Sequence, residues 1–344
     1  MNNIIFQDEP ILLRLLRRLK FFYVKTGFNK SFIESNYDDI RKGNDIIREL
    51  ITNNLSSPNE LYGSGGGVMF SRMGTVELEN YCSFQSLLLV QKGKKSILLK
   101  DFFYACCNLK NYDVRKCFPK LITNAGFYPE NLSLGMKWSG LVSQDLSEVD
   151  CFVSYQKLEG YIKNEIRNCF KVNFYSLCAP FLTNNPWSSL LEGKNVLVIH
   201  PFTDTIKMQY EIHRDKIFPG TNVLPKFKNL YLIKAVQSSA GAQTSYETWF
   251  DALRYMEKEI DKFPDFDIAL IGCGAYGMHL AAYCKRKGKI GLHLASYVQL
   301  LFGIYGKRWI EDDRISPFIN ESWVRPSEKE RPQNFLSIEE GCYW

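Results

Sequence analysis

The chain has 344 residues, of which 45% are hydrophobic and 23% are charged, a composition typical of ordinary soluble globular proteins. Its formal net charge is +6, which favours phosphorylated ligands or an acidic surface and is too small to indicate a nucleic acid as partner. Its apolar runs all fall short of the roughly 20 residues that a membrane-spanning helix needs.

The ten cysteines contain no C-x-x-C pair, and the sequence shows no signal peptide. Reduced thiols and a cytoplasmic location are therefore expected. The four histidines are scattered along the chain, which argues against a histidine-rich zinc site.

The first 60 residues are expected to form a helical N-terminal extension. Residues 11–23 are amphipathic and basic, and two interpretations stay open. The segment packs on the protein body as a helix, or it lies as a peripheral helix on an anionic membrane face. Residues 38–53 also show helical spacing of apolar side chains.

A glycine cluster at residues 63–67 separates this extension from a predicted strand, Val68–Ser71. Helical periodicity resumes over residues 75–91, with Thr75 as the expected N-cap. Further helices are predicted over residues 101–125, in two pieces, and over residues 131–144. A strand is predicted over residues 149–154.

From residue 194 onward, strands and helices alternate regularly. The strands are predicted at residues 195–199, 230–236, 267–271 and 290–293, and the helices at residues 204–216, 245–261 and 278–287. This pattern predicts an α/β fold over residues 61–310, with a mainly parallel Rossmann-like sheet and helices on both faces. Residues 311–344 are expected to wrap around that domain, because their tryptophans require burial.

Ligands of such sheets bind beyond the carboxyl ends of the strands. The loops that follow these ends are therefore the expected site, and they come after Ser71, Ile199, Val236, Ile271 and His293.

Arg72, Gly74 and Glu77 follow the first predicted strand. An arginine can bind a diphosphate through two parallel hydrogen bonds. Glu77, in the first turn of the next helix, is a candidate ligand for Mg²⁺ or Mn²⁺, which prefer oxygen. The alternative is a surface arginine and a glutamate that is stabilised by the helix dipole.

Residues 272–277, G-C-G-A-Y-G, join a predicted strand to a predicted helix. Glycines at such a junction let backbone N–H groups approach a phosphate. A dinucleotide site also needs an acidic residue about 20 positions later, and the next strand ends in H-L-A-S. We therefore reject a nicotinamide-dependent dehydrogenase. A phosphate or sugar facing Gly272, Gly274, Tyr276 and Gly277 is expected, and a tight turn without ligand is the alternative.

Two further groups are candidates. Gln299, Lys307 and Arg308 lie among glycines and aromatic residues that suit a phosphate or a sugar ring, or they form a solvated helix end. His200 and Asp204 follow another strand and are candidate catalytic groups, although a histidine in this position more often has a structural role.

Residues 70–77, F-S-R-M-G-T-V-E, resemble the S-x-R-x-G-D-G-E signature of glycosyltransferases with the GT-D type fold. The C-terminal half is similar to a group of mostly uncharacterised bacterial and viral proteins close to that fold. The similarity rests on VLVIHPF at 196–202, KAVQS at 234–238, IGCGAYG at 271–277, LFGIYGKRW at 301–309 and GCYW at 341–344. Together these resemblances cover roughly residues 60–344.

The resemblance implies an α/β enzyme that binds a nucleotide-sugar and holds a divalent metal through an Asp-x-Glu element. Arg72, Gly74 and Glu77 match the signature, whereas Thr75 stands where the family has an aspartate. Three alternatives stay open. Glu77 acts alone with oxygens of the donor, Asp204 or Asp150 is recruited, or Arg72, Lys307 and Arg308 act without a metal.

The resulting expectation is a cytoplasmic glycosyltransferase that transfers a sugar from a nucleotide-sugar to a cell-surface polysaccharide or glycan. Mn²⁺ or Mg²⁺ is its expected cofactor and Glu77 the metal ligand. Glu77, His200 and Asp204 are the candidate catalytic residues. The alternative, favoured by the missing aspartate, is a non-catalytic protein that binds a nucleotide or a sugar phosphate. Neither the donor sugar nor the oligomeric state follows from the sequence.

Overall fold

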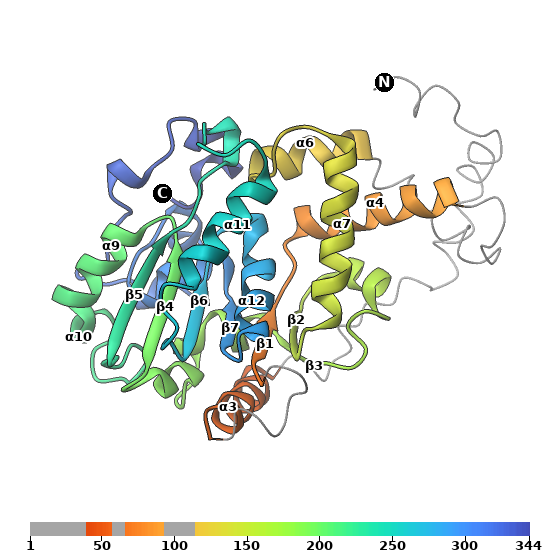
Figure 1. Cartoon of the computed structure of the whole chain (residues 1–344). Coiled ribbons are helices and arrows are strands. Elements are labelled where there is room, and N and C mark those ends of the chain that lie inside the picture. The colour runs from red at the N-terminus through yellow and green to blue at the C-terminus, as the bar shows by residue number, and fades with distance from the viewer. Residues whose placement is uncertain (1–38, 57–65, 93–113) are drawn as a thin grey trace.

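The computed structural model describes residues 39–56, 66–92 and 114–344. Within them the fold is α/β, with a seven-stranded sheet in the order β3-β2-β1-β7-β6-β4-β5 and helices on both faces (Figure 1). Every strand pair is parallel, so the predicted fold class is confirmed. Residues 11–23, and the first part of the helical region predicted at 101–125, lie outside the described residues.

All strands except one overlap a predicted strand. Their bounds are β1 (Val68–Ser71), β2 (Cys151–Ser154), β3 (Phe170–Asn173), β4 (Asn195–His200), β5 (Asn229–Lys234), β6 (Ile268–Ile271) and β7 (Ile290–His293). The exception is β3, an edge strand in which Val172 is the one fully buried residue. Its sequence, F-K-V-N, does alternate apolar and polar residues, but over four residues only, which is the shortest alternation that indicates a strand.

The sheet separates two hydrophobic cores, because alternate residues of each strand point to opposite faces. Met69, Leu197 and Ile271 belong to the first core. That core is covered by α4 (Thr75–Lys92), α6 (Val114–Ala125), α7 (Leu132–Ser147), α11 (Trp249–Ile260) and α12 (Gly277–Arg286). In Figure 1, α7, α11 and α12 lie in front of the sheet.

The second core contains Val68, Phe70 and Val198. It is covered by α3 (Ile40–Ser56), α8 (Phe174–Cys178), α9 (Thr203–Met208), α10 (Arg214–Ile217), α13 (Val298–Leu301) and α14 (Lys307–Ile310). The helix predicted over residues 38–53 is α3, which buries Ile47 and Ile51 in this core. The C-terminal part of the expected extension thus packs on the α/β body.

Two helix starts show how local sequence sets the element bounds. At α11, the Thr248 hydroxyl accepts the N–H of Asp251 at 3.2 Å, and the Asp251 carboxylate accepts the N–H of Thr248 at 3.0 Å. This capping box satisfies N–H groups that a helix start leaves unpaired. At α4, Thr75 is the first helical residue and Gly74 precedes it, so the expectation that Thr75 is the N-cap was wrong.

The residues from 311 onward form short turns that pack against the body, with Trp323 buried and Trp344 half-buried. The last of them dock on the start of α14. The N–H of Arg308 donates to the Cys342 carbonyl at 3.1 Å, and the N–H of Lys307 donates to the Trp344 carbonyl at 3.3 Å. The LFGIYGKRW and GCYW segments are therefore two sides of one contact.

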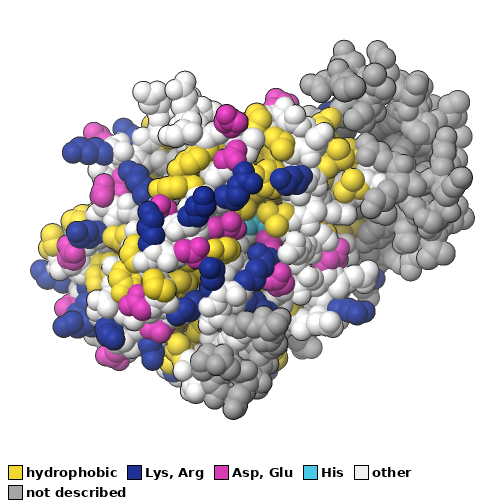
Figure 2. Space-filling view, viewed as in Figure 1, with side chains coloured by type: hydrophobic (Ala, Val, Ile, Leu, Met, Phe, Trp, Pro, Cys, Tyr) yellow, Lys and Arg dark blue, Asp and Glu magenta, His cyan; other side chains and the backbone are white. Residues whose placement is uncertain are grey.

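No helix in the described part of the chain is long and apolar enough to cross a membrane. On the face drawn in Figure 2, the Lys, Arg, Asp and Glu side chains of the described residues are interspersed. The positive charge is thus not gathered in a single patch on that face.

Candidate functional site

A cavity of about 540 Å³ opens at the carboxyl edge of the sheet. Its size is that of a small-molecule site, and its position is where open α/β sheets bind ligands. Each strand contributes a lining residue at or just after its carboxyl end, namely Arg72, Tyr155, Phe174, His200, Ala235, Gly272 and His293. The loops that the sequence singled out therefore surround one cavity.

Arg72 is held between two aromatic rings. Its guanidinium carbon lies 5.1 Å from the ring centre of Tyr155 and 5.2 Å from that of Phe174. Its Nη2 donates to the Tyr155 hydroxyl, which in turn donates to the Met73 carbonyl at 2.8 Å. The Nε of Arg72 is buried without a hydrogen-bond partner in the described part of the chain. The charge is thus fixed in position by aromatic faces.

Glu77 lies in the first turn of α4 and is half-buried in the cavity wall. Its carboxylate folds back over Gly74, where a Cβ atom would lie only 2.1 Å from Oε2, so a side chain at this position would displace the carboxylate. Burial raises the pKa of Glu77 above its ordinary value. Its own N–H and the charge of Arg72 oppose that shift, and Glu339 adds to it. A carboxyl group with a raised pKa is suited to proton transfer.

Metal binding has limited support from the side chains. Thr75, in the place of the family's aspartate, is exposed at the cavity. Among the described residues, no three His, Cys, Asp or Glu side chains come together as a metal site. Glu77 would therefore need oxygens of a bound ligand to complete the coordination of Mg²⁺ or Mn²⁺.

The glycine turn after β6 lines the cavity in part. Gly272 leaves no room for a side chain, because a Cβ atom would lie 2.3 Å from the Ala295 carbonyl oxygen, and Gly274 has a φ of +58°. Tyr276 also lines the cavity. Gly277 does not, since it packs against His293, whose Nε2 would be 2.4 Å from a Cβ atom. The turn is therefore shaped by close packing, and Gly272 and Gly274 face the cavity.

Tyr276 is itself tightly held. Its ring stacks on Trp249 with the centroids 4.8 Å apart and an interplanar angle of 4°. Its hydroxyl lies 3.1 Å from the Ser238 Oγ, and that Oγ donates to the Gly126 carbonyl at 2.5 Å. A ligand thus meets a rigid wall on this side of the cavity.

His200 is a hydrogen-bond donor at the cavity wall. Its Nδ1 accepts the N–H of Phe202 at 3.1 Å, so in the neutral ring the proton is on Nε2. Burial lowers the pKa of His200 to about 3. A neutral imidazole whose basic nitrogen is already engaged is a poor general base. His200 is therefore better suited to orient a ligand oxygen than to take a proton.

Three candidate groups lie away from the cavity. Asp204 is exposed in the first turn of α9, where its N–H donates to Glu330 Oε1 at 2.8 Å. Lys307 is exposed on α14. Asp150 precedes β2, at the opposite edge of the sheet, and pairs with Lys285 Nζ at 2.8 Å. None of the three lines the cavity.

Gln299 and Arg308 do line the cavity and meet the C-terminal residues there. The buried Gln299 donates to the Ile304 carbonyl at 3.3 Å and to the Tyr343 carbonyl at 3.4 Å. Arg308 forms an ion pair with Glu339, and its guanidinium carbon lies 4.8 Å from the ring centre of Tyr343. Part of the cavity wall is thus built by residues near the end of the sequence.

The sequence did not identify several of the lining residues. Tyr155 and Phe174 hold Arg72, and Glu339, Tyr343 and Trp344 form a wall. Tyr155 could have been found by position alone, because it directly follows the predicted strand at residues 149–154. No local signal marks Glu339 or Phe174, because their roles depend on partners far away in the sequence.

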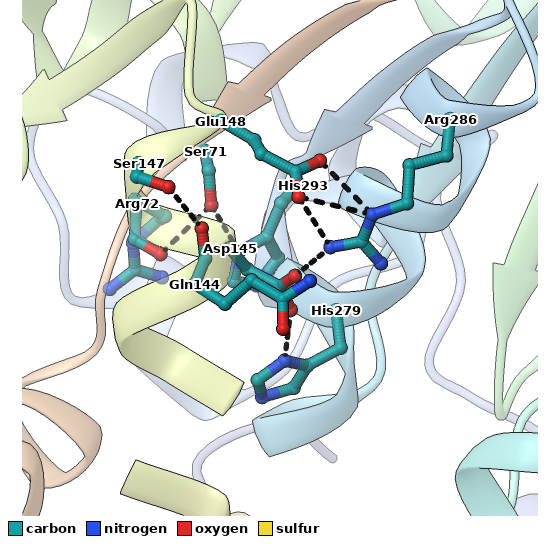
Figure 3. Close-up of polar contacts among 9 residues, drawn as sticks. All are labelled: Ser71, Arg72, Gln144, Asp145, Ser147, Glu148, His279, Arg286 and His293. Atoms are coloured by element: carbon teal, nitrogen blue, oxygen red, sulfur yellow. Dashed lines mark hydrogen bonds and ion pairs between the residues drawn. The ribbon is translucent and has the colours of Figure 1, made fainter. Parts of the chain in front are cut away.

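Behind the cavity, buried polar contacts join β1, α7, α12 and β7 (Figure 3). The Ser71 Oγ lies 3.3 Å from the Nδ1 of His293. Asp145 is fully buried between Arg286 and His279, with its Oδ2 2.5 Å from the His279 Nδ1. Burial, together with the nearby charge of Arg72, lowers the pKa of His293 to about 3. The Ser71–His293 contact joins β1 to β7, and the contacts of Asp145 join α7 to α12.

Comparisons of the chain with protein-family models, with curated proteins and with solved structures found no match. Its function must therefore be inferred from the residues of the cavity.

Proposed function

We propose that the chain is a glycosyltransferase that binds a nucleotide-sugar in this cavity and transfers the sugar to a polysaccharide or glycan acceptor. One observation supports the proposal above the others. Arg72 and Glu77, the residues of the glycosyltransferase-like signature, line the same cavity as Gly272 and Gly274. Basic groups and a phosphate-compatible turn thus surround the place where a donor diphosphate would lie.

Arg72 is assigned to the diphosphate. Departure of a nucleoside diphosphate leaves negative charge on its oxygens, and fixed donors stabilise that charge most effectively. Arg72 meets this requirement because two aromatic rings and the Tyr155 hydroxyl hold its guanidinium in place. Such a donor needs little rearrangement as the charge develops.

Glu77 is assigned one of two roles, binding a divalent cation or accepting the proton of the acceptor hydroxyl. Arg72 and Arg308 are formally balanced by Glu77 and Glu339 in the cavity wall. A divalent cation bound by Glu77 and the donor would supply the additional positive charge that a leaving diphosphate requires. Without a cation, the raised pKa of Glu77 suits it to accept the proton of the attacking hydroxyl. If turnover persists when EDTA has removed divalent cations, Glu77 is assigned to accepting the proton of the attacking hydroxyl.

His200 is assigned to orienting the ligand. Its Nδ1 is engaged by the Phe202 N–H, and its Nε2–H remains as a donor in the cavity wall. A hydroxyl or phosphate oxygen of the donor is a suitable acceptor.

The second candidate is a protein that binds a nucleotide or a sugar phosphate without turnover. Thr75 in place of an aspartate favours it, because a single carboxylate at this position is a weak metal ligand. Arg72 and the glycine turn would serve binding equally well in such a protein.

A panel of nucleotide-sugars with Mn²⁺ or Mg²⁺ separates the two functions. A transferase releases nucleoside diphosphate by transfer or hydrolysis, whereas a binding protein shows only thermal stabilisation. We expect Glu77→Gln to lower turnover by about 100-fold or more. Glu79→Gln is the matched control, since Glu79 lies on the same helix outside the cavity, 3.9 Å from Lys120 Nζ.

If Glu77→Gln turns over as fast as the wild type, Glu77 does not have the role assigned to it. Nucleotide-sugar binding without any release of nucleoside diphosphate would favour the binding protein. Titration with NADH is expected to leave its fluorescence unchanged, in keeping with the absent ribose-binding acid.

A further inference from the structure

The carboxylate of Glu339 is bound by the cavity wall much as a ligand anion would be. Its Oε2 accepts a hydrogen bond from Arg308 Nη2 and another from the Tyr343 hydroxyl at 3.1 Å. The Cys342 Sγ lies 3.5 Å from the same oxygen. A guanidinium together with a hydroxyl is also a donor set that binds a phosphate oxygen. Arg308, Tyr343 and Glu339 all line the cavity.

The charge of Glu339 is felt elsewhere in the cavity, since it contributes to the raised pKa of Glu77. Glu339 therefore lies on the same side as the carboxylate that is proposed to act on the donor. A ligand phosphate in this region would encounter two carboxylates, of which only Glu339 is paired with an arginine within 4 Å in the described part of the chain.

The backbone around Glu339 is in an uncommon conformation. Glu339 has a φ of 47° and its neighbour Glu340 a φ of 58°, values that residues other than glycine rarely adopt. Gly341 follows with a φ of 73°. Residues on either side anchor this turn, through Arg308 N–H to the Cys342 carbonyl and Gly341 N–H to the Ile338 carbonyl. The carboxylate is thus held in the cavity wall by a turn that local preferences disfavour.

We propose that Arg308 and the Tyr343 hydroxyl form an anion subsite for one phosphate of the bound nucleotide, and that Glu339 occupies this subsite when no ligand is bound. The nature of the ligand, a nucleoside diphosphate, rests on the proposed function. Binding then exchanges the Arg308–Glu339 pair for an Arg308–phosphate pair. Glu339 acts as an internal competitor that lowers the affinity for the nucleotide.

The size of this competition follows from the exposure of the pair. The side chains of Arg308 and Glu339 are 38% and 35% exposed. Ion pairs of that exposure contribute little, so removing the Glu339 charge should tighten nucleotide binding by about two- to fivefold. The gain should shrink as salt is added, because salt screens partly exposed charges.

Glu340 provides a matched control. It is adjacent in sequence, shares the positive φ and is exposed, but it does not line the cavity. Glu339→Gln and Glu340→Gln change the net charge of the chain equally. A difference between the two variants therefore reports the position of the charge rather than its total.

The test is calorimetric titration of the full chain with uridine and guanosine diphosphates at low salt. We expect Glu339→Gln to bind about two- to fivefold more tightly than the wild type, Glu340→Gln to match the wild type, and Arg308→Gln to bind more weakly. The double variant Arg308→Gln, Glu339→Gln should lose the gain of Glu339→Gln, because the arginine that benefits from it is absent.

Unchanged or weaker binding by Glu339→Gln, or an equal gain in Glu340→Gln, would overturn the proposal. Tighter binding by Glu339→Gln, with no nucleoside diphosphate released from the nucleotide-sugar panel, would keep the subsite and reject the transferase. If none of the variants binds either nucleotide, both the anion subsite and the transferase are rejected. Even the subsite freed of the Glu339 charge would then bind no phosphate.

Discussion

Single residues decide what chemistry the cavity can support. Arg72 has a fixed position and a buried Nε without a partner in the described part of the chain. Glu77 has a raised pKa and folds over Gly74. His200 and His293 are held neutral by burial. These four side chains therefore supply a fixed cation, a carboxyl group with a raised pKa and two uncharged imidazoles.

The neutral state of His200 predicts a specific dependence of stability on pH. Its folded-state pKa of about 3 lies below the ordinary 6.5, so the unfolded chain takes up a proton first as the pH falls. The contribution to stability is complete above pH 6.5 and is lost progressively from there down to about pH 3. Between pH 7.5 and pH 5, His200 alone should lower the free energy of unfolding by about 2 kcal/mol.

Urea denaturation of the wild type and of His200→Asn at both pH values measures this effect. The asparagine retains an acceptor for the Phe202 N–H but cannot be protonated. We expect the loss of stability on acidification to be about 2 kcal/mol smaller in the variant. An identical loss in both proteins would show that His200 is not buried as a neutral ring.

At the scale of elements, the contact between α14 and the residues that follow it closes one side of the cavity. Gly306 makes the contact close, because a Cβ atom there would lie 2.4 Å from the Tyr343 carbonyl carbon. A backbone atom at that distance cannot move aside without shifting residues 342–344. The wall formed by Tyr343 and Trp344 therefore depends on this glycine.

We expect Gly306→Ala to lower the free energy of unfolding by roughly 1 to 3 kcal/mol, as for other overpacked sites, and to weaken nucleotide binding. Gly140→Ala is the control, since Gly140 lies within α7 and no atom of the described residues lies within 4 Å of the added Cβ. That change should stabilise the chain by about 0.5 to 1 kcal/mol. Equal effects of the two substitutions in chemical denaturation would contradict the close docking.

The elements that the sequence predicted well are those with a strong local pattern. In α11, Trp249, Leu253, Met256 and Ile260 are buried as their helical spacing predicted. β6 is apolar throughout and β4 is apolar from Val196 to Ile199, which made their positions evident. By contrast, β3 buries little of its surface and was missed. The Arg308–Glu339 pair joins residues 31 positions apart, a relation that no local pattern encodes.

The residues of the candidate site were likewise predictable only where a local sequence pattern marks them. Arg72, Gly74 and Glu77 were found because they form a compact signature beside a strand end. The aromatic rings that hold Arg72 come from two other strand ends, and their meeting depends on the strand order β3-β2-β1. Asp204 was expected at the site because it follows a strand end, and Lys307 because it forms a basic pair beside glycines and aromatic residues. Each lies instead on an exposed part of its own short helix.

At the scale of the whole molecule, one cavity collects residues from across the chain. β1 to β3 supply Arg72 and its aromatic partners, and β4 and β6 supply His200 and the glycine turn. Residues near the end of the sequence close the remaining side. The C label in Figure 1 lies toward the same end of the sheet as α4 and α6. Residues 339, 343 and 344 thus pack on the body and also line this cavity.

The central claim is that Arg72, Glu77 and the turn at residues 272–274 bind one nucleotide diphosphate. The most direct test is a crystal structure of the chain with the nucleoside diphosphate that stabilises it most in the panel. We predict diphosphate oxygens within hydrogen-bonding distance of Arg72 and beside the Gly272–Gly274 turn, with Glu77 facing the sugar-binding side. A nucleotide bound outside this cavity, or with its phosphates directed away from both Arg72 and Glu77, would contradict the proposed function.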